Sequence, residues 1–414
     1  MKKPFPIILL VAVFFTLVFC QCSQAAQQKT ETLTIGVTLA LSGPASGTGI
    51  LQKKAIEALS EDFNKAGGLV IKGQRYNINT IIEDDKYSAE GGRAAYEKLI
   101  TRDKVTIIIN TIGAAPVMAG IDIAEPNKVL MLVQTSDPRV LEPQYHYVYS
   151  CVPLRMNYPV QWGWIAKNQP QIKKICLLAW DDITGHNDVA MHSNCIQAFG
   201  LKAPEALYYP RSITDWAPVA AKVKQLNPDM VAGSGMLPGG QQGTVWKALY
   251  QAGWRGVTNN GVGIGLAENL EIAGKEPLEN WMGPITDGSG LKSVPASLTK
   301  LIQVYEAKYG AGSWNKDRMA TNIMWLSSWY FLVDALKKAN SLDTTEIAAA
   351  MQNLQVETPS GLRKLIVPPQ RKDNSRTVEV VGQVFFGQIK DGKINHVGTV
   401  TIDEAMNYIK TVYK

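Results

Sequence analysis

The sequence predicts an α/β protein built from two similar, doubly wound lobes, each with a parallel sheet. Short continuous runs of Val, Ile and Leu alternate with amphipathic segments of helical spacing. This is the pattern of parallel strands that helices cover on both faces. The alternation starts again near residue 174, and 414 residues are enough for two lobes of ordinary domain size.

The first strand opens the most informative segment, Leu33 to Gly49, LTIGVTLALSGPASGTG. Its apolar run ends at Ser42-Gly43-Pro44, and helical spacing begins after Gly47 and Gly49. A buried strand that ends in a Gly-rich turn at the start of a helix presents free backbone N–H groups to a ligand. We therefore expect this turn to belong to a binding site.

The remaining elements follow in order along the chain. In the first unit, a helix over 50–66 is stopped by Gly67-Gly68, and Ser88 caps a helix that runs to about Arg102. Strands are expected at 76–82, 105–109 and 129–133. In the second unit we expect strands at 174–179, 208–209 and 230–232, a strand or turn at 256–259, and helices at 186–199, 216–226 and 243–252. The later chain has helices at 295–309, 320–339 and 344–354, then a β-hairpin over 378–402 that turns at Asp391-Gly392.

The N-terminal segment has the features of a secretion signal. A positively charged start precedes an almost wholly apolar run over 5–19, and small residues end at Ala25, where a signal peptidase would cleave. The run is too short for a membrane span, so we expect a signal peptide of residues 1–25. A lipid anchor at Cys20 or Cys22 is the second-ranked alternative, because a bulky residue precedes each cysteine.

Composition excludes several classes of function. Loss of the two lysines of the signal peptide takes the 42 basic residues to 40 against 36 acidic residues, a net charge of about +4 without a basic patch. We therefore expect no nucleic-acid partner. Three widely spaced cysteines remain, and an odd number argues against a disulfide framework. Cys176 and Cys195 lie on a strand and the helix behind it, so a bridge and two buried thiols both stay open, with the thiols favoured.

An enzyme would need a catalytic constellation that this sequence lacks. The segment Gly261 to Gly265 has the wrong spacing for a dinucleotide loop, and neither a GxSxG nor an HExxH pattern occurs. His186, His192 and Asp188 share one helix, but the two histidines lie on different faces, which favours a solvated surface over a metal site. We expect no enzyme activity, no metal and no cofactor.

Ligands of open α/β sheets bind at the carboxyl ends of the strands. Six loops that are small, hydroxyl-bearing or Gly-rich meet at this edge, namely 42–49, 113–116, 134–137, 180–185, 233–236 and 260–263. Any one of them can be explained by chain turning alone, which Gly and Ser favour. Six such loops across two lobes favour a cleft whose N–H and hydroxyl donors hold a small polar ligand.

With these motifs the chain resembles the periplasmic solute-binding proteins of branched-chain amino acid ABC transporters, the leucine/isoleucine/valine-binding family with the type I periplasmic binding fold. The motifs that carry the resemblance are Ile35 to Gly49, Ala66-Gly67-Gly68, Glu83 to Asp85 followed by Tyr87-Ser88-Ala89, Asn110 to Pro116, Val129 to Pro138, Trp180 to Gly185, and Asn260-Gly261-Val262 leading to Ile272-Ala273-Gly274. They span essentially the whole mature chain.

The resemblance implies a fold of two lobes joined by a three-crossover hinge, which closes over the ligand. It places the N-terminal lobe at 32–152 and 284–360 and the C-terminal lobe at 153–283 and 361–414. The crossovers are then expected near Cys151 to Arg155, near Trp281 to Pro284, and within Thr358 to Thr377. The implied function is that of a periplasmic solute-binding protein of an ABC importer, with a small-molecule ligand and a membrane permease as partners. We expect a monomer.

Carried over position by position, the family's ligand-binding residues are largely replaced. Its amino-acid binders have tyrosines where this chain has Thr48 and Thr184, and their serine for the α-carboxylate falls at Gly113 or Ala114. Their acidic partner of the α-ammonium falls at Asn260. Because burying an ammonium without a carboxylate partner is costly, the resemblance predicts a ligand other than an ordinary α-amino acid.

Arg155 stands at the first crossover, where the family commonly has an acidic residue. Together with Thr135, Ser136 and the amides of residues 113 and 114 it can hold a carboxylate bidentately. A surface salt bridge between the lobes is the alternative for this arginine. Trp180 or Trp281 can stack on the ligand. We therefore predict a carboxylate that lacks the amine, either aromatic or a dicarboxylate.

The predicted ligand-binding residues are Thr48, Ile112, Gly113, Ala114, Thr135, Ser136, Arg155, Trp180, Thr184, Met236, Asn260 and Trp281. Two alternative functions stay open at this point. One is a ligand-sensing receptor domain of the same fold, and the other is a conventional binder of branched-chain or hydrophobic amino acids.

Overall fold

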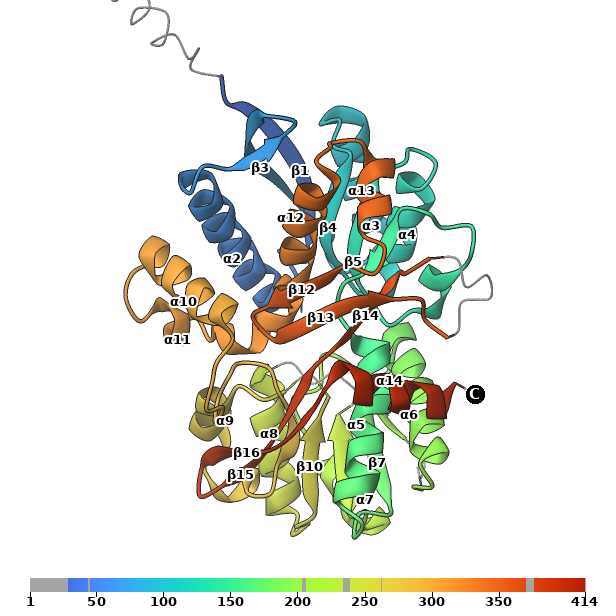
Figure 1. Cartoon of the computed structure of the whole chain (residues 1–414). Coiled ribbons are helices and arrows are strands. Elements are labelled where there is room, and N and C mark those ends of the chain that lie inside the picture. Colours follow the sequence, from blue (N-terminus) through green and yellow to red (C-terminus); the bar gives the residue numbers. More distant parts are fainter. Residues whose placement is uncertain are drawn as a thin grey trace, which may run out of the picture.

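The computed structural model describes residues 29–43, 45–202, 206–233, 239–261, 263–369 and 376–413. These residues form two α/β lobes, one above the other in Figure 1. The predicted signal peptide, with Cys20 and Cys22, lies outside the described residues. No helix in the described part is both long and apolar enough to cross a bilayer.

The first lobe is built on a nine-stranded sheet with the strand order β12-β13-β14-β6-β5-β4-β1-β3-β2. Its strands are β1 (Glu31–Leu39), β2 (Leu69–Ile71), β3 (Gln74–Asp84), β4 (Ile107–Ile112), β5 (Leu130–Gln134), β6 (Val148–Ser150), β12 (Gln355–Thr358), β13 (Gly361–Ile366) and β14 (Glu379–Gly382). The pairs from β3 through β1, β4, β5 and β6 to β14 are parallel, as the continuous apolar runs predict. β2, β12 and β13 add antiparallel pairs towards the two edges.

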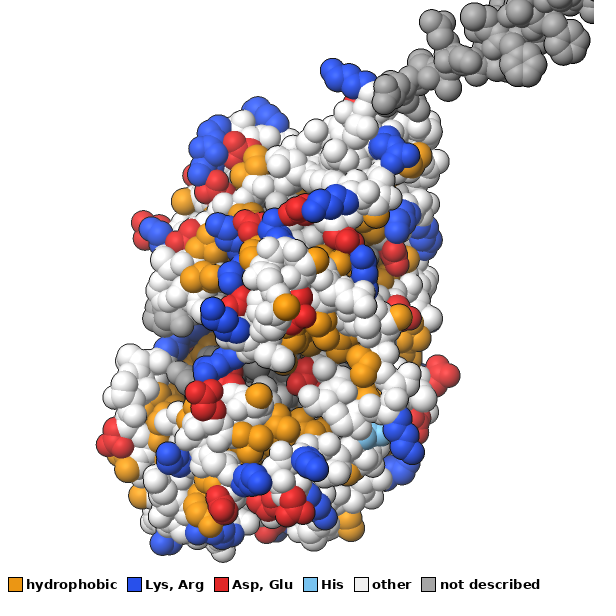
Figure 2. Space-filling model, turned by 90° about the vertical axis from the view of Figure 1, so that its left-hand side faces the viewer, with side chains coloured by type: hydrophobic (Ala, Val, Ile, Leu, Met, Phe, Trp, Pro, Cys, Tyr) orange, Lys and Arg blue, Asp and Glu red, His pale blue; other side chains and the backbone are white. Residues whose placement is uncertain are grey.

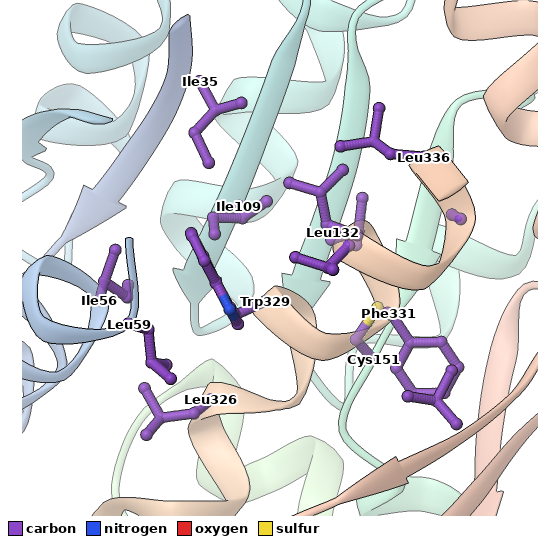
Figure 3. Close-up of a cluster of buried hydrophobic side chains, with 14 of the residues drawn as sticks. Ile35, Ile56, Leu59, Ile109, Leu132, Cys151, Leu326, Trp329, Phe331 and Leu336 are labelled. Carbon is purple, nitrogen blue, oxygen red and sulfur yellow. The ribbon is translucent and has the colours of Figure 1, made fainter. Parts of the chain in front are cut away.

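Helices pack the apolar faces of this sheet. They are α2 (Ser46–Lys65), α3 (Ala89–Glu97), α4 (Ala114–Ala124), α10 (Ala296–Tyr309), α11 (Ser313–Lys316), α12 (Ser327–Ala339) and α13 (Thr344–Ala350). In Figure 3, Ile35, Ile109 and Leu132 of the strands face Trp329 of α12 and Leu59 of α2 across one buried cluster. Each such side chain stabilises the fold by about 1.5–3 kcal/mol on burial.

The second lobe has a four-stranded parallel sheet with the order β10-β9-β7-β8 and a three-stranded antiparallel sheet with the order β11-β15-β16. The strands are β7 (Ile175–Trp180), β8 (Leu207–Tyr209), β9 (Met230–Gly233), β10 (Val257–Asn260), β11 (Met282–Ile285), β15 (Val384–Lys390) and β16 (Lys393–Val400). The helices are α5 (Leu154–Asn168), α6 (Ile183–Ala198), α7 (Ala217–Leu226), α8 (Gly239–Gln251), α9 (Leu266–Ala273) and α14 (Ile402–Val412). The predicted hairpin with its turn at Asp391-Gly392 is confirmed from Val384 onwards as β15 and β16, whereas the start of its predicted first strand forms β14 of the first lobe. Cys151, Cys176 and Cys195 are buried free thiols.

Three chain segments connect the lobes. The first links β6 to α5 and the second follows β11, while the third is a short link at Gln383 between β14 and β15. The third crossover therefore comes later than the predicted range 358–377, and the predicted lobe boundary after residue 360 falls inside a tight hairpin. In that hairpin Thr358 Oγ1 donates to the Gly361 carbonyl at 2.8 Å, which keeps β12 and β13 in the same sheet.

The C-terminal helix α14 begins with a capping box. Thr401 Oγ1 accepts from the Glu404 N–H at 3.3 Å, and the Glu404 carboxylate accepts from the Thr401 N–H at 3.0 Å. Both N–H groups would otherwise lack partners. We expect Thr401→Ala to lower the free energy of unfolding by about 1 kcal/mol and Thr401→Ser to leave it nearly unchanged. Urea unfolding followed by circular dichroism measures both, and equal stabilities of the two variants would contradict the assigned cap.

Candidate ligand-binding cleft

The two lobes contact each other at several points of the junction between them. Beside α9 and α11, Arg318 of the first lobe pairs with Glu268 and Glu271 of the second lobe, at 3.2 and 3.0 Å. Figure 2 shows that side of the molecule, where the surface is hollowed between the lobes and basic and acidic side chains lie at the edge of the hollow. Elsewhere in the junction, Ser136 after β5 faces Asp188 on α6. The structure is therefore a closed arrangement of the lobes.

Each lobe starts a helix directly against the end of a strand. A Cβ atom at Gly49 would lie 2.0 Å from the carbonyl oxygen just past β1, and a Cβ atom at Gly185 would lie 2.0 Å from the carbonyl oxygen of Trp180 at the end of β7. Only glycine permits such a close approach of backbone to backbone. Thr48 and Thr184 precede these two glycines, so they occupy equivalent positions in the two lobes.

The turn after β1 is held by the end of β3. Asp84 accepts hydrogen bonds from the Leu41 N–H at 2.8 Å and from Ser42 Oγ at 2.6 Å. Burial alone would raise the pKa of Asp84, but these hydrogen bonds lower it overall, so the carboxylate stays charged. The next residue, Asp85, accepts from the Tyr87 N–H at 2.8 Å. Two neighbouring carboxylates thus fix both the Gly-rich turn and the backbone of Tyr87.

A cation lies between two aromatic rings where these turns meet. The guanidinium carbon of Arg211 lies 3.6 Å from the ring centre of Trp180 in the second lobe and 4.4 Å from that of Tyr87 in the first lobe. Arg211 Nε also donates to Asp182 at 2.6 Å, and Asp182 caps α6. The Tyr87 ring covers Gly113, where a Cβ atom would lie 2.6 Å from the ring. The two lobes therefore share one aromatic–cation–aromatic stack, which we call the Arg211 stack.

The phenol of Tyr87 is neutral in this stack. Burial raises its pKa, and the positive charge of Arg211 offsets only part of that rise. Tyr87 also has a backbone φ of 52°, and the preceding Lys86 has a φ of 53°. Two successive residues other than glycine in the left-handed region are strained, by about 1–3 kcal/mol each. The fold thus holds this ring over the cleft at a cost in backbone energy.

Asp188 is a buried carboxyl at the lobe junction. It has no exposed surface, and the hydroxyl groups of Ser136 and Tyr158 are its polar neighbours. Burial raises its pKa to about 7; the nearby Ser136, Tyr158 and Arg155 lower it in part, while Asp182 raises it further. The carboxyl group is therefore protonated in mildly acidic solution.

We expect Asp188 to make stability fall with rising pH. The unfolded chain loses this proton near pH 4, whereas the folded chain keeps it until about pH 7, so the folded state weakens across that window. Asp188→Asn should match the natural chain near pH 4 and exceed its free energy of unfolding by about 4 kcal/mol at pH 8. Urea unfolding at several pH values measures this, and parallel pH profiles for the two proteins would contradict it.

His192 shares this buried region. Its Nδ1 accepts a hydrogen bond from Trp162 Nε1 at 2.8 Å, and its ring lies 3.9 Å from that of Tyr158, centre to centre. Burial lowers the pKa of His192 to about 3, so the ring is neutral at physiological pH. The expected solvated surface is thus wrong for His192 and Asp188, because α6 packs these residues inward; His186 alone of the three is exposed.

Arg155 has a different partner from the predicted ligand. Its Nε donates to both oxygens of Glu379, at 3.0 and 3.1 Å, and its Nη1 donates to the carbonyl of Asp137. The side chains of this ion pair are 1% and 0% exposed. Arg155 is therefore neither a surface salt bridge nor a free carboxylate binder. It ties the first crossover to β14, just before the third crossover.

Comparison with known proteins identifies the family to which this architecture belongs. The family model described as periplasmic binding protein matches residues 32–393. The chain belongs to this family. It is 22% identical over 346 residues to the leucine-, isoleucine-, valine-, threonine- and alanine-binding protein of Pseudomonas aeruginosa, which covers 83% of this chain and 87% of that protein.

Solved structures of periplasmic binding proteins have the same fold. A leucine-binding protein of Thermotoga maritima superposes with a TM-score of 0.69 at 20% identity, over 90% of this chain and 99% of that one. A solute-binding protein of Rhodopseudomonas palustris BisB5, in complex with 3,4-dihydroxybenzoic acid, gives a TM-score of 0.70 at 20% identity, over 90% and 98% of the chains. The predicted type I periplasmic binding fold is confirmed.

In this periplasmic binding protein, two predicted ligand donors are engaged within their own lobe. The Gly113 N–H donates to the Gln134 carbonyl at 3.0 Å, and Thr135 Oγ1 accepts from the Asp137 N–H at 3.1 Å. Both groups thus hold the turns after β4 and β5. Ala114 is the first residue of α4 and is buried beside them.

The other predicted positions are spread over the junction and the core. Trp281 is fully buried and packs its ring against Gly283, so it is a core residue of the second lobe. Asn260 is buried at the end of β10, and Ile112 is half-buried at the end of β4. Met236 lies outside the described residues.

The sequence did not single out Tyr87, Arg211 or Asp182 as ligand-binding residues. Tyr87 follows the Asp84-Asp85 pair and Arg211 follows β8, so both come just after the carboxyl end of a strand, where ligands of α/β sheets bind. The sequence signal that could have indicated them was a charged or aromatic residue just after the carboxyl end of a strand. Nothing in the sequence indicates that the two side chains meet, because 124 residues of chain separate them.

Proposed function

We propose that this chain is the solute-binding component of an ABC importer and that it captures an aromatic carboxylate between its lobes. The Arg211 stack carries this proposal. Arginine pairs with a carboxylate bidentately, and here the guanidinium is held between rings that come from both lobes. A ligand that touches this stack contacts both lobes at once, which is what closure around a ligand requires.

The geometry of the stack favours a planar ligand. Asp182 accepts from Nε and lies on the Nη2 side of Arg211, and we assign the Nη1 side to the carboxylate of the ligand. The faces of Trp180 and Tyr87 lie beside that guanidinium and offer offset or edge contacts to an aromatic ring. Thr48 and Thr184 leave room where amino-acid binders of the family have tyrosines, so the pocket can hold a ring.

An α-amino acid fits this site less well. Asn260, at the position of the family's ammonium partner, carries no charge. An ammonium group would therefore lose its hydration without gaining a carboxylate partner, which is unfavourable. The R. palustris relative that was solved with 3,4-dihydroxybenzoic acid supports an aromatic acid instead.

The cellular setting is part of the same proposal. The predicted signal peptide of residues 1–25 exports the chain to the periplasm, where a membrane permease receives the closed, loaded form. We propose a monomer, which analytical ultracentrifugation of the mature chain tests directly.

Calorimetry of ligand-free protein tests the proposed ligand class. The mature chain is unfolded in denaturant, dialysed and refolded to remove any retained solute, then titrated with 4-hydroxybenzoate, 3,4-dihydroxybenzoate and leucine. We expect saturable binding of the two aromatic acids, with Kd values on the order of micromolar or tighter, and no heat from leucine. Tight leucine binding without a response to either aromatic acid would instead assign a conventional amino-acid binder.

A further inference from the structure

Arg363 is a buried arginine without a counter-ion in the part of the chain that the structure describes. It lies on β13 with 3% of its surface exposed, and its Nη2 donates to the Ser360 carbonyl at 3.3 Å. Its Nε and Nη1 have no hydrogen-bond partner among the described residues. Arg155 is buried to the same extent, but its Nε meets Glu379 at 3.0 Å. Of the two arginines near the hinge, Arg155 thus has an anionic partner and Arg363 has none among the described residues.

The neighbouring strand of the sheet leaves space for this guanidinium. Arg363 pairs across the strands with Gly382 of β14, and a Cβ atom at residue 382 would lie 2.1 Å from Nη1 and 2.6 Å from Cδ of the arginine. A glycine at this position therefore lets the side chain lie flat over the neighbouring strand. Val356 of β12 lies opposite on the other side. The charge is held inside by packing rather than extended to solvent.

The guanidinium remains charged in this position. Burial lowers the pKa of Arg363 to about 10, and no carboxylate among the described residues offsets that shift. A group with this pKa is protonated at neutral pH. Because a buried charge without a partner is strongly unfavourable, such charges in proteins are paired or bind an ion.

The position of Arg363 connects it to lobe movement. Ser360, whose carbonyl accepts from Arg363, donates through Oγ to the Thr286 carbonyl at 3.4 Å. Thr286 directly follows β11 on the second crossover, and Gly382 directly precedes the third. Arg363 therefore lies where two of the three chain segments between the lobes come together.

We propose that Arg363 binds a small anion at the hinge, either an inorganic anion such as chloride or a carboxylate group. The anion supplies the missing counter-charge and stabilises the arrangement of the lobes in which this guanidinium is buried. This site is separate from the Arg211 stack, so it does not depend on the proposed ligand. It uses the planar N–H donors of Arg363, which suit either kind of anion.

Thermal unfolding in controlled anions tests the proposal. Refolded, ligand-free protein is kept at constant ionic strength with a bulky sulfonate as the background anion, and chloride or acetate replaces it stepwise. We expect Tm to rise by about 3–5 °C as the anion concentration increases to a hundredfold above Kd. Arg363→Met should abolish the rise. The exposed Arg102→Met, which removes the same charge, should retain it.

The two anions separate the two sources of the negative charge. A rise with chloride and acetate alike assigns a site for small anions in general, and a rise with acetate alone assigns a site for a carboxylate group. A flat Tm of the natural chain in every anion, or an equal rise in Arg363→Met, overturns the proposal. If that variant does not fold, chloride-35 line broadening decides: the natural chain and Arg363→Lys should broaden the signal, and acetate should reverse it. A signal that neither protein broadens and no anion competes for also overturns it.

Discussion

Replacing Glu379 with glutamine is expected to lower the free energy of unfolding by about 3–5 kcal/mol, because it leaves the buried guanidinium of Arg155 without its counter-ion. The pair is almost entirely out of solvent, and Arg155 Nε donates to both carboxylate oxygens. The exchange keeps the size of the side chain and one hydrogen-bond acceptor, so the loss reports the charge. Urea unfolding followed by tryptophan fluorescence measures it.

A double variant separates the charge from the packing. Arg155→Met combined with Glu379→Leu removes both charges and keeps similar volume, and we expect it to recover most of the stability lost in Glu379→Gln. A loss below about 1 kcal/mol in the single variant would show that water reaches the pair and screens the charge.

The same pair explains how the first and third crossovers are kept together. Arg155 is the second residue of α5, which directly follows the first crossover. Glu379 is the first residue of β14, which directly precedes the third crossover. A third interaction, from Arg155 Nη1 to the Asp137 carbonyl, reaches the turn that carries Thr135 and Ser136. The hinge and one wall of the cleft are thus fixed by a single side chain, which accounts for an arginine at this position better than contact with ligand does.

The fold could be predicted from the sequence because the residue patterns that indicate its strands and turns are local. Continuous apolar runs predict buried parallel strands, and Gly49 and Gly185 mark the two close turns where a helix must start against a strand. The third crossover did not follow, because β13 and β14 have the same apolar character as strands of either lobe. Pairing partners decide which sheet takes them, and pairing is not local.

The site followed only in outline. Its loops were recognisable from Gly and Ser, but their hydrogen bonds turn inward, as the Gly113 N–H and Thr135 Oγ1 show. Asp188 illustrates the remaining difficulty. Its helix has little amphipathic character, so helical spacing alone did not indicate which face the first lobe would cover. Burial of a helix by the other lobe leaves no periodic pattern in the sequence of that helix.

Arg211 is held by contacts from its own lobe and from the other lobe. Asp182 fixes the guanidinium from within the second lobe through a short hydrogen bond, whereas Tyr87 reaches it from the first lobe on a strained backbone. Strain of this kind persists only where surrounding structure enforces it, and it is commonly found at ligand clamps. The backbone of Tyr87 and the position of Arg211 therefore support the same assignment independently.

Arg211→Gln is expected to weaken binding of 4-hydroxybenzoate about 100-fold, since a charge-assisted pair contributes about 1.5–3 kcal/mol and 1.4 kcal/mol corresponds to a factor of ten. Glutamine keeps donors near the same place but loses the charge and the flat stacking surface. Arg211→Lys keeps the charge and should bind with intermediate affinity, because lysine offers no planar fork. Isothermal titration at constant ionic strength measures the three dissociation constants.

A matched control lies on the same lobe. Arg255 stacks on the ring of Tyr250 with its guanidinium carbon 3.6 Å from the ring centre, the same distance that separates Arg211 from Trp180. Arg255 contacts only its own lobe through this ring and the carbonyls of Tyr250 and Trp254. Arg255→Gln therefore loses an equivalent cation–π contact and an equal charge, and it should bind 4-hydroxybenzoate like the natural chain. Equal affinity of all the variants would place the carboxylate elsewhere in the cleft, whereas a loss confined to Arg211 ties ligand recognition to the cation that aromatic rings of both lobes hold.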